Sequence, residues 1–160
     1  MNHVQITKST RHSKIAGDFG EALVLYWLSK HGFECARVDH TGIDLIAHRP
    51  DTTEVMGISV KSRTRTKGTE GESVTIPAKD FEKIQAACAA FGCSPYLAVV
   101  VDAASAIKVL VTSLAHFLEL CPRSKSASYW KMSKHCVTKY EHDPQVMAFR
   151  LSTQIRRWWE

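Results

Sequence analysis

Apolar residues in this chain switch between helical and strand spacing, and that alternation restricts the fold more than any other feature. Helical spacing runs from about residue 13 to residue 31, with Ser13 as a candidate N-cap and Gly32 as a candidate stop. Short apolar runs typical of strands follow at 33–38, 43–47 and 55–62. Pro77 and Gly92 then bound a second predicted helix over 78–91. Helix, three strands and helix in this order predict an α/β fold.

The remaining segments extend this pattern. Residues 63–72 are rich in Thr, Gly and basic side chains and predict a loop. Further elements are predicted as strands at 73–76, 96–101, 107–111, 129–132 and 146–151, a short helix at 113–120, and a basic helical piece at or before Tyr140. We therefore expect an α/β sandwich with a mixed sheet.

Composition places the chain among ordinary globular proteins. It has 160 residues, of which 44% are apolar and 23% charged, which suits one domain over 1–160. We expect a core over about 13–112 and a C-terminal elaboration over 113–160 that either binds DNA or forms a dimer. There is no run of 18 apolar residues, no signal-peptide pattern and no Cys-x-x-Cys among five cysteines, so we expect a cytoplasmic protein with reduced thiols and no membrane association.

The positive charge is concentrated in blocks. Lys and Arg total 21 against 16 Asp and Glu, a net charge of +5. Basic residues without acids occupy the segment before Asp18, the stretch 61–67 and the segment 121–140. Three such blocks on a small domain favour nucleic acid as the partner, with a membrane surface or an acidic protein as the alternatives.

Three charged residues do not fit a plain core. Glu21 has mostly apolar helical neighbours, so it is either half-exposed at the edge of the apolar stripe or a buried carboxylate that needs a cation. Asp44 lies inside the apolar run 43–47, where it either caps the preceding turn or carries chemistry. Lys61 ends the strand 55–62.

A hairpin between the strands at 43–48 and 55–62 would bring two of these residues together. If opposed residue numbers sum to 103, Asp44 faces Ser59, and side-chain alternation puts Lys61 on the same face. Ile43, Leu45, Ile58 and Val60 would then line the other face. Asp44 and Glu21 could hold Mg²⁺ to polarise a phosphodiester and activate a water, while Lys61 orients that water or stabilises the developing charge.

These residues resemble the motifs of the PD-(D/E)XK nuclease superfamily, which has the restriction-endonuclease-like fold. The matching segments are Gly17–Glu21 on the first helix, Gly42–Ala47 on a strand and Ser59–Ser62 on the next strand, in the family's order and spacing. Within the superfamily the chain is most similar to small archaeal-type Holliday junction resolvases. The resemblance implies a three-layer sandwich whose central mixed sheet of four or five strands is flanked by helices, and a homodimer.

The resemblance also implies roles for particular residues. Glu21 and Asp44 would be metal ligands with the main-chain carbonyl of Val60, and Lys61 would be the catalytic lysine. Ser59 stands where the family usually has Glu, Asp or Gln, and serine supplies no charge. Some restriction enzymes of the superfamily take the missing acid from the next helix, which makes Glu82 the candidate, with Glu70 and Glu72 as weaker ones. Otherwise Glu21 suffices, or the site binds DNA without cutting it.

The sequence therefore predicts an endonuclease that uses Mg²⁺, for which Mn²⁺ may substitute, to hydrolyse DNA, either branched or duplex. The alternatives are an inactive nucleic-acid-binding protein with the same fold and a sequence-specific homing or restriction enzyme. Phosphate contacts are predicted for five basic residues: Arg11, Lys14, Arg63, Arg65 and Lys67.

Other polar and aromatic residues carry weaker signals. Cys121, His135, Cys136 and His142 match no common zinc spacing, and Asp39 and His40 beside the predicted site have ordinary turn roles. Four aromatic residues near basic ones could stack on bases, although for Trp130 a core position is the better interpretation: Tyr129, Trp130, Trp158 and Trp159.

Overall fold

A six-stranded mixed sheet forms the centre of the molecule in the computed structural model, which describes residues 7–154. The strand order is β1-β2-β3-β5-β6-β8, with β3 and β5 parallel and the other neighbours antiparallel. The strands are β1 (Glu34–His40), β2 (Ile43–His48), β3 (Val55–Thr64), β5 (Ser94–Ala103), β6 (Ala106–Ser113) and β8 (Val146–Ser152).

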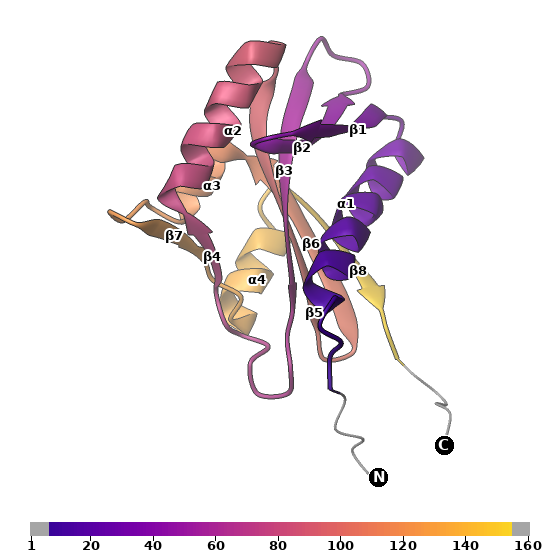
Figure 1. Cartoon of the computed structure of the whole chain (residues 1–160), viewed down its shortest axis with the longest axis vertical. Coiled ribbons are helices and arrows are strands. Elements are labelled where there is room, and N and C mark those ends of the chain that lie inside the picture. The colour runs from indigo at the N-terminus through magenta and orange to yellow at the C-terminus, as the bar shows by residue number, and fades with distance from the viewer. Residues whose placement is uncertain (1–6, 155–160) are drawn as a thin grey trace.

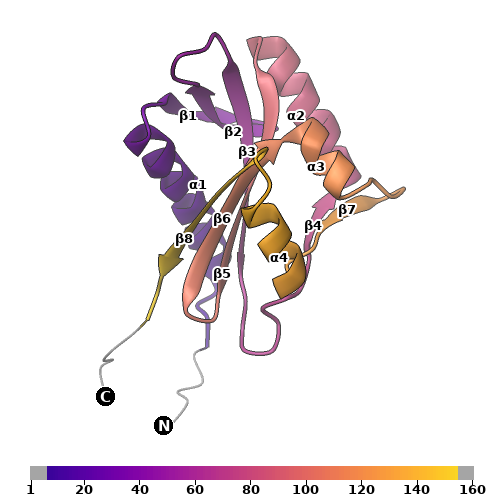
Figure 2. The same cartoon turned by 180° about the vertical axis from the view of Figure 1, so that it is seen from behind.

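Helices cover both faces of this sheet (Figure 1; Figure 2). Helix α1 (His12–Lys30) packs on one face, and α2 (Ala78–Phe91), α3 (Leu114–Leu120) and α4 (Lys134–Glu141) lie on the other. A two-stranded ribbon of β4 (Val74–Pro77) and β7 (Ala127–Trp130) adjoins the second face. The predicted sandwich of three layers is confirmed, with six strands in the sheet rather than four or five.

The last third of the described chain is built into this architecture. Strand β8 pairs with β6 over Ala106–Thr112, and Phe149 of β8 stacks on Trp27 of α1 with ring centroids 4.7 Å apart. On the other face Trp130 is buried and stacks between Phe117 and Tyr140, which confirms the core position preferred for it.

Helix α1 approaches the sheet closely along one side only. Its buried residues are Gly20, Leu23, Val24 and Leu28. A methyl group at Gly20 would collide with the Ser62 hydroxyl of β3, so this glycine sets the distance between α1 and the sheet. The apolar residues at the outer side of the same helix remain exposed to solvent: Ile15, Phe19 and Tyr26.

The β2–β3 hairpin has the predicted register. Leu45 lies opposite Ile58 and Ile46 opposite Gly57, so opposed numbers sum to 103. The prediction that Ile43 lines the α1 face is wrong, because Ile43 packs in the core under α2 with Ile84. The cause is a register shift in the β1–β2 pairing between Arg37 and His40, which turns the start of β2.

Within residues 7–154, no helix is both long enough and apolar enough to cross a membrane.

Candidate active site

An open pocket lies where the starts of β2 and α2 meet the middle of β3. Its volume is about 380 Å³, counted with its mouth. It is lined by Thr41, Gly42, Asp44, Ser59, Lys61, Asp80 and Lys83. The structure therefore brings together Asp44, Ser59 and Lys61, as the hairpin register predicts, and adds two charged residues from α2.

Asp44 is fixed at the back of this pocket by the neighbouring strand. The main-chain N–H of Val60 donates to the Asp44 carboxylate, with an N to Oδ2 distance of 2.6 Å. Burial raises the pKa of Asp44, and the Val60 N–H, the Lys61 ammonium and the Ser59 side chain oppose that rise. Because the N–H and C=O of one strand residue point to the same edge, the carbonyl of Val60 lies on the side of Asp44.

Lys61 forms an ion pair with an acid that the sequence analysis missed. Lys61 Nζ lies 3.0 Å from Asp80 Oδ2, and the two side chains are only 24% and 19% exposed. Asp80 lies in the first turn of α2, where the helix dipole favours a carboxylate. No local signal distinguishes Asp80 from Glu82 in the sequence, since both flank the buried Phe81 on α2.

Glu82, the acid predicted to replace the one missing at Ser59, does not reach the pocket. Its side chain is 68% exposed and pairs with Arg123 at 3.2 Å. Residues two apart on a helix point about 200° apart, so Asp80 and Glu82 cannot face the same site. The weaker candidates are occupied on the loop after β3: Glu70 accepts from the Gly68 N–H, and Glu72 pairs with Arg65.

Glu21 approaches the same region from α1 but does not line the pocket. Its Oε2 lies 3.0 Å from a guanidinium nitrogen of Arg37, which also donates to the main-chain carbonyl of Asp18. Burial and the negative charge of Asp44 raise the pKa of Glu21, while Arg37 lowers it. Arg37 was not predicted from the sequence. Its positive charge offsets the repulsion between the carboxylates of Glu21 and Asp44.

Ser59 is buried and takes part in the site as a neutral partner. Its side chain hydrogen-bonds the carboxylate of Asp44, which lowers the pKa of that acid. Ser59 therefore adds no negative charge at the position where the family usually has an acid. Besides Asp44, the carboxylate that lines the pocket is that of Asp80.

The turn between β1 and β2 is pressed against α2 and holds Asp44 in place. Gly42 has a φ of +110°, and a methyl group there would collide with the main-chain carbonyl of Lys83. Only glycine combines this backbone conformation with so close an approach. The distance between Asp44 and the two charged residues of α2 is thus set at Gly42.

The donor set of the pocket fits a hard divalent cation such as Mg²⁺. Within residues 7–154, no three His, Cys, Asp or Glu side chains converge as a ready metal cluster. Mg²⁺ commonly binds through one or two carboxylates and keeps its remaining ligands as waters or substrate phosphates. Asp44 and Asp80 supply two such carboxylates in a pocket open to solvent.

The predicted DNA-binding residues have different environments. Arg65 is only 15% exposed and donates to the main-chain carbonyl of Ser73 at 2.8 Å, so it fastens the loop after β3 rather than facing solvent. Arg63 is half-buried and donates to the carbonyls of Ser62 and Thr75. The other three predicted phosphate contacts are exposed: Arg11, Lys14 and Lys67. Of these, Lys14 forms an ion pair with Asp18.

The remaining candidates lie apart from the pocket. Cys121 is buried, and His142 Nδ1 hydrogen-bonds the carbonyl of Thr138 in its own helix, so these residues form no metal cluster in the described chain. His40 packs edge-on against Phe91 with ring centroids 5.0 Å apart. Trp158 and Trp159 lie outside the described residues.

No protein-family model and no curated protein matches this chain. Among solved structures, it is similar to Archaeoglobus fulgidus Hjc, a Holliday junction resolvase from an archaeal hyperthermophile. That match has a TM-score of 0.55 and 20% identity, and it covers 78% of this chain and 87% of that chain. A restriction endonuclease solved with substrate DNA matches with a TM-score of 0.41 and 11% identity, covering 95% of this chain and 76% of that chain. The chain therefore has the same fold as this resolvase, the restriction-endonuclease-like sandwich predicted from the sequence.

Proposed function

We propose that this protein is a metal-dependent endonuclease that hydrolyses DNA phosphodiester bonds, using Mg²⁺ or Mn²⁺. The observation that carries the proposal is the pairing of Lys61 with Asp80 beside Asp44, in one open pocket. Two carboxylates and an ammonium are the groups that hydrolysis of a phosphodiester needs, and the fold is that of a Holliday junction resolvase.

Each residue of the pocket has a distinct part in this reaction. Asp44, Asp80 and the Val60 carbonyl would hold the cation, with Glu21 as a further carboxylate on the α1 side. When bound, the cation supplies a Lewis acid that polarises the phosphodiester and activates water. Lys61 then places its ammonium against the phosphate oxygens, where negative charge develops in the transition state.

DNA binding would rely on the basic residues predicted from the sequence. Arg11, Lys14 and Lys67 are exposed, and Arg63 lies on the face of β3 that carries Lys61. Phosphate contacts give affinity without sequence preference, which supports a substrate chosen by its structure, such as a four-way junction. The resemblance to resolvases leads us to propose a cytoplasmic homodimer. Sedimentation equilibrium would measure the mass of the particle in solution.

Cleavage of plasmid, linear and four-way-junction DNA in Mg²⁺ or Mn²⁺ tests the proposal. Asp44→Asn and Lys61→Ala should each lower the rate about 100-fold or more, because the first removes a carboxylate that would hold the cation and the second removes the ammonium that would face the reacting phosphate. Asp80→Asn should do the same, while Glu82→Gln makes the matching charge change on the outer side of α2 and should leave the rate unchanged.

The outcomes separate the alternatives. Wild-type protein that binds DNA but never cuts it would support an inactive binding protein, which the neutral Ser59 favours. Cleavage that persists in both Asp44→Asn and Lys61→Ala would refute the residue assignment. Full activity of Asp80→Asn with loss in Glu82→Gln would return the acidic role to Glu82.

A further inference from the structure

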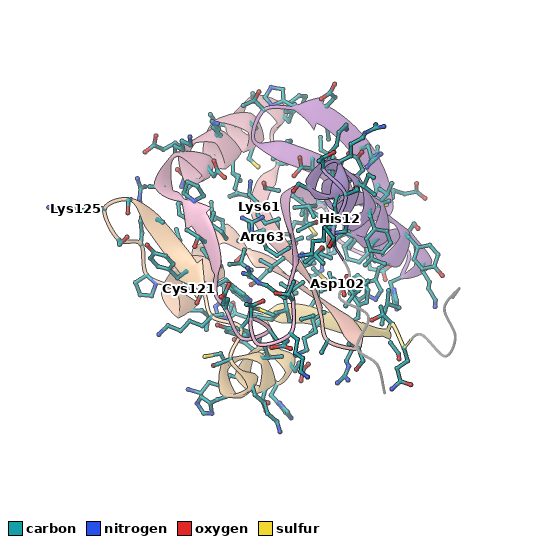
Figure 3. All side chains as sticks on the ribbon, turned by 60° about the horizontal axis from the view of Figure 1, so that its bottom comes forward. His12, Lys61, Arg63, Asp102, Cys121 and Lys125 are labelled. Carbon is teal, nitrogen blue, oxygen red and sulfur yellow. The ribbon has the colours of Figure 1, made fainter. Side chains whose placement is uncertain are left out.

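A second hollow lies on the opposite side of β3 from the candidate active site, between α1 and the sheet. It measures about 420 Å³, counted with its open mouth. Figure 3 shows His12 and Asp102 on this side of β3, and Lys61 on the other. Its main lining side chains are His12, Ile15, Phe19, Ser62, Thr64 and Asp102.

The walls of this hollow are largely apolar, and two of their side chains are exposed among the residues that the structure describes. Ile15 and Phe19 are 54% and 48% exposed, although both are large apolar residues on a helix that packs on the sheet. An exposed apolar patch at the mouth of a concave site is typical of a surface that a ligand completes. The exposed ring of Phe19 offers a flat face for stacking.

The floor of the hollow contains a polar group that lacks a partner. The Ser62 hydroxyl is buried and makes no hydrogen bond within the described residues. Buried polar groups in native proteins are almost always paired, so the unpaired Ser62 hydroxyl, which lies against Gly20 of α1, is a hydrogen-bonding group that an occupant of the hollow reaches when the Ser62 side chain turns. Asp102 adds an acceptor nearby, and His12 Nε2 is held 3.0 Å from the Thr64 hydroxyl.

Basic residues lie next to two lining residues of the hollow, Thr64 and His12. Lys8 is exposed and donates to the main-chain carbonyl of Thr64 at 2.9 Å, and Arg11 and Lys14 are exposed at the start of α1. A flat apolar platform, a few hydrogen-bonding groups and a cationic rim are the features that bind single-stranded nucleic acid, whose bases stack while its phosphates meet the cations.

We propose that this hollow binds one unpaired base of the DNA strand that is cut. The base stacks on Phe19, its polar edge meets Ser62 and Asp102, and the flanking phosphates lie near Lys8 and Arg11. Ser62 directly follows Lys61 on β3, and their side chains point to opposite faces of the sheet. This inference rests on the proposed function and narrows its substrate to DNA with an unpaired nucleotide close to the scissile phosphodiester.

Equilibrium binding without metal tests the hollow separately from catalysis. The probe is a duplex with a short unpaired stretch in one strand, made with either a thymine or an abasic residue at its centre, and measured by fluorescence anisotropy in EDTA. Wild-type protein should bind the thymine probe about tenfold more tightly than the abasic one, the scale of one base stacked on an aromatic ring. Phe19→Ala should bind both probes alike, within about twofold.

Tyr26→Ala is the matched control, because Tyr26 is an exposed aromatic residue of the same helix that does not line the hollow. It should keep the wild-type preference for the thymine probe. The proposal is overturned if Phe19→Ala keeps the tenfold preference, or if wild-type protein binds both probes equally or neither. If wild-type protein prefers the thymine probe but cleaves no DNA, the proposed function is refuted while the proposed base-binding site is supported.

Ser62→Ala gives a second test that a purely structural role would not pass. Removing an unpaired buried hydroxyl should leave the melting temperature unchanged or raise it, yet the preference for the thymine probe should fall about threefold. An unchanged preference would overturn the contact between the base and Ser62.

Discussion

Replacement of Gly42 by alanine should weaken the fold because two independent costs meet at this residue. The φ of +110° is a backbone conformation that side chains disfavour, at a cost of about 1–2 kcal/mol. The new methyl group would also collide with the Lys83 carbonyl, and forcing extra volume into a packed contact costs about 1–3 kcal/mol. Together these predict a loss of about 2–5 kcal/mol in the free energy of unfolding.

Gly68→Ala separates the two costs. Gly68 has a φ of +91°, and no atom lies within 4 Å of a methyl group built there, so this variant should lose only the conformational part. Urea denaturation of both variants, followed by tryptophan fluorescence, measures the difference in unfolding free energy. If the two losses agree within about 0.5 kcal/mol, the β1–β2 turn is not pressed against α2, and our account of how Asp44 is positioned fails.

Three further variants probe other parts of the structure. Gly17→Ala places a methyl group in open space within α1, so calorimetry should show stabilisation of about 0.5–1 kcal/mol. His116 lies 2.8 Å from Asp143 and 3.1 Å from Glu119, and the Asp143 bond is the main cause of its raised pKa. Protonated His116 therefore adds stability that is full below about pH 6.5 and is lost as pH rises through the raised pKa, and urea titrations of His116→Gln should lack this slope. Trp130→Ala should cost about 3–5 kcal/mol, because the ring is fully buried in an aromatic stack; a smaller loss in denaturation experiments would contradict that packing.

Local signals in the sequence were enough for the elements and for part of the site. Pro77 and Gly92 bound α2 as predicted, because the proline ring fixes φ at the start and glycine freely adopts the left-handed conformation that ends a helix. The β2–β3 register followed from side-chain alternation about a short turn, which is why Asp44 and Lys61 share one pocket.

Features that depend on tertiary packing were out of reach. Asp80 and Glu82 flank the buried Phe81 on α2, and only the position of the β1–β2 turn decides which of them faces the pocket. Arg65 belongs to a basic stretch that indicates phosphate binding, yet its hydrogen bonds to the loop are formed only once that loop folds back. Sequence periodicity fixes which side of an element is buried but not which neighbour it meets.

The pairing of β8 with β6 has a consequence for synthesis on the ribosome. Strand β6 is buried along most of its length, and one of its edges is covered only by β8, which lies more than thirty residues further along the chain. Until residue 152 has been translated, that edge presents unpaired amide groups beside apolar side chains, an arrangement prone to association with other chains. Nascent or truncated chains that end before β8 should therefore depend on chaperones more than the full chain does.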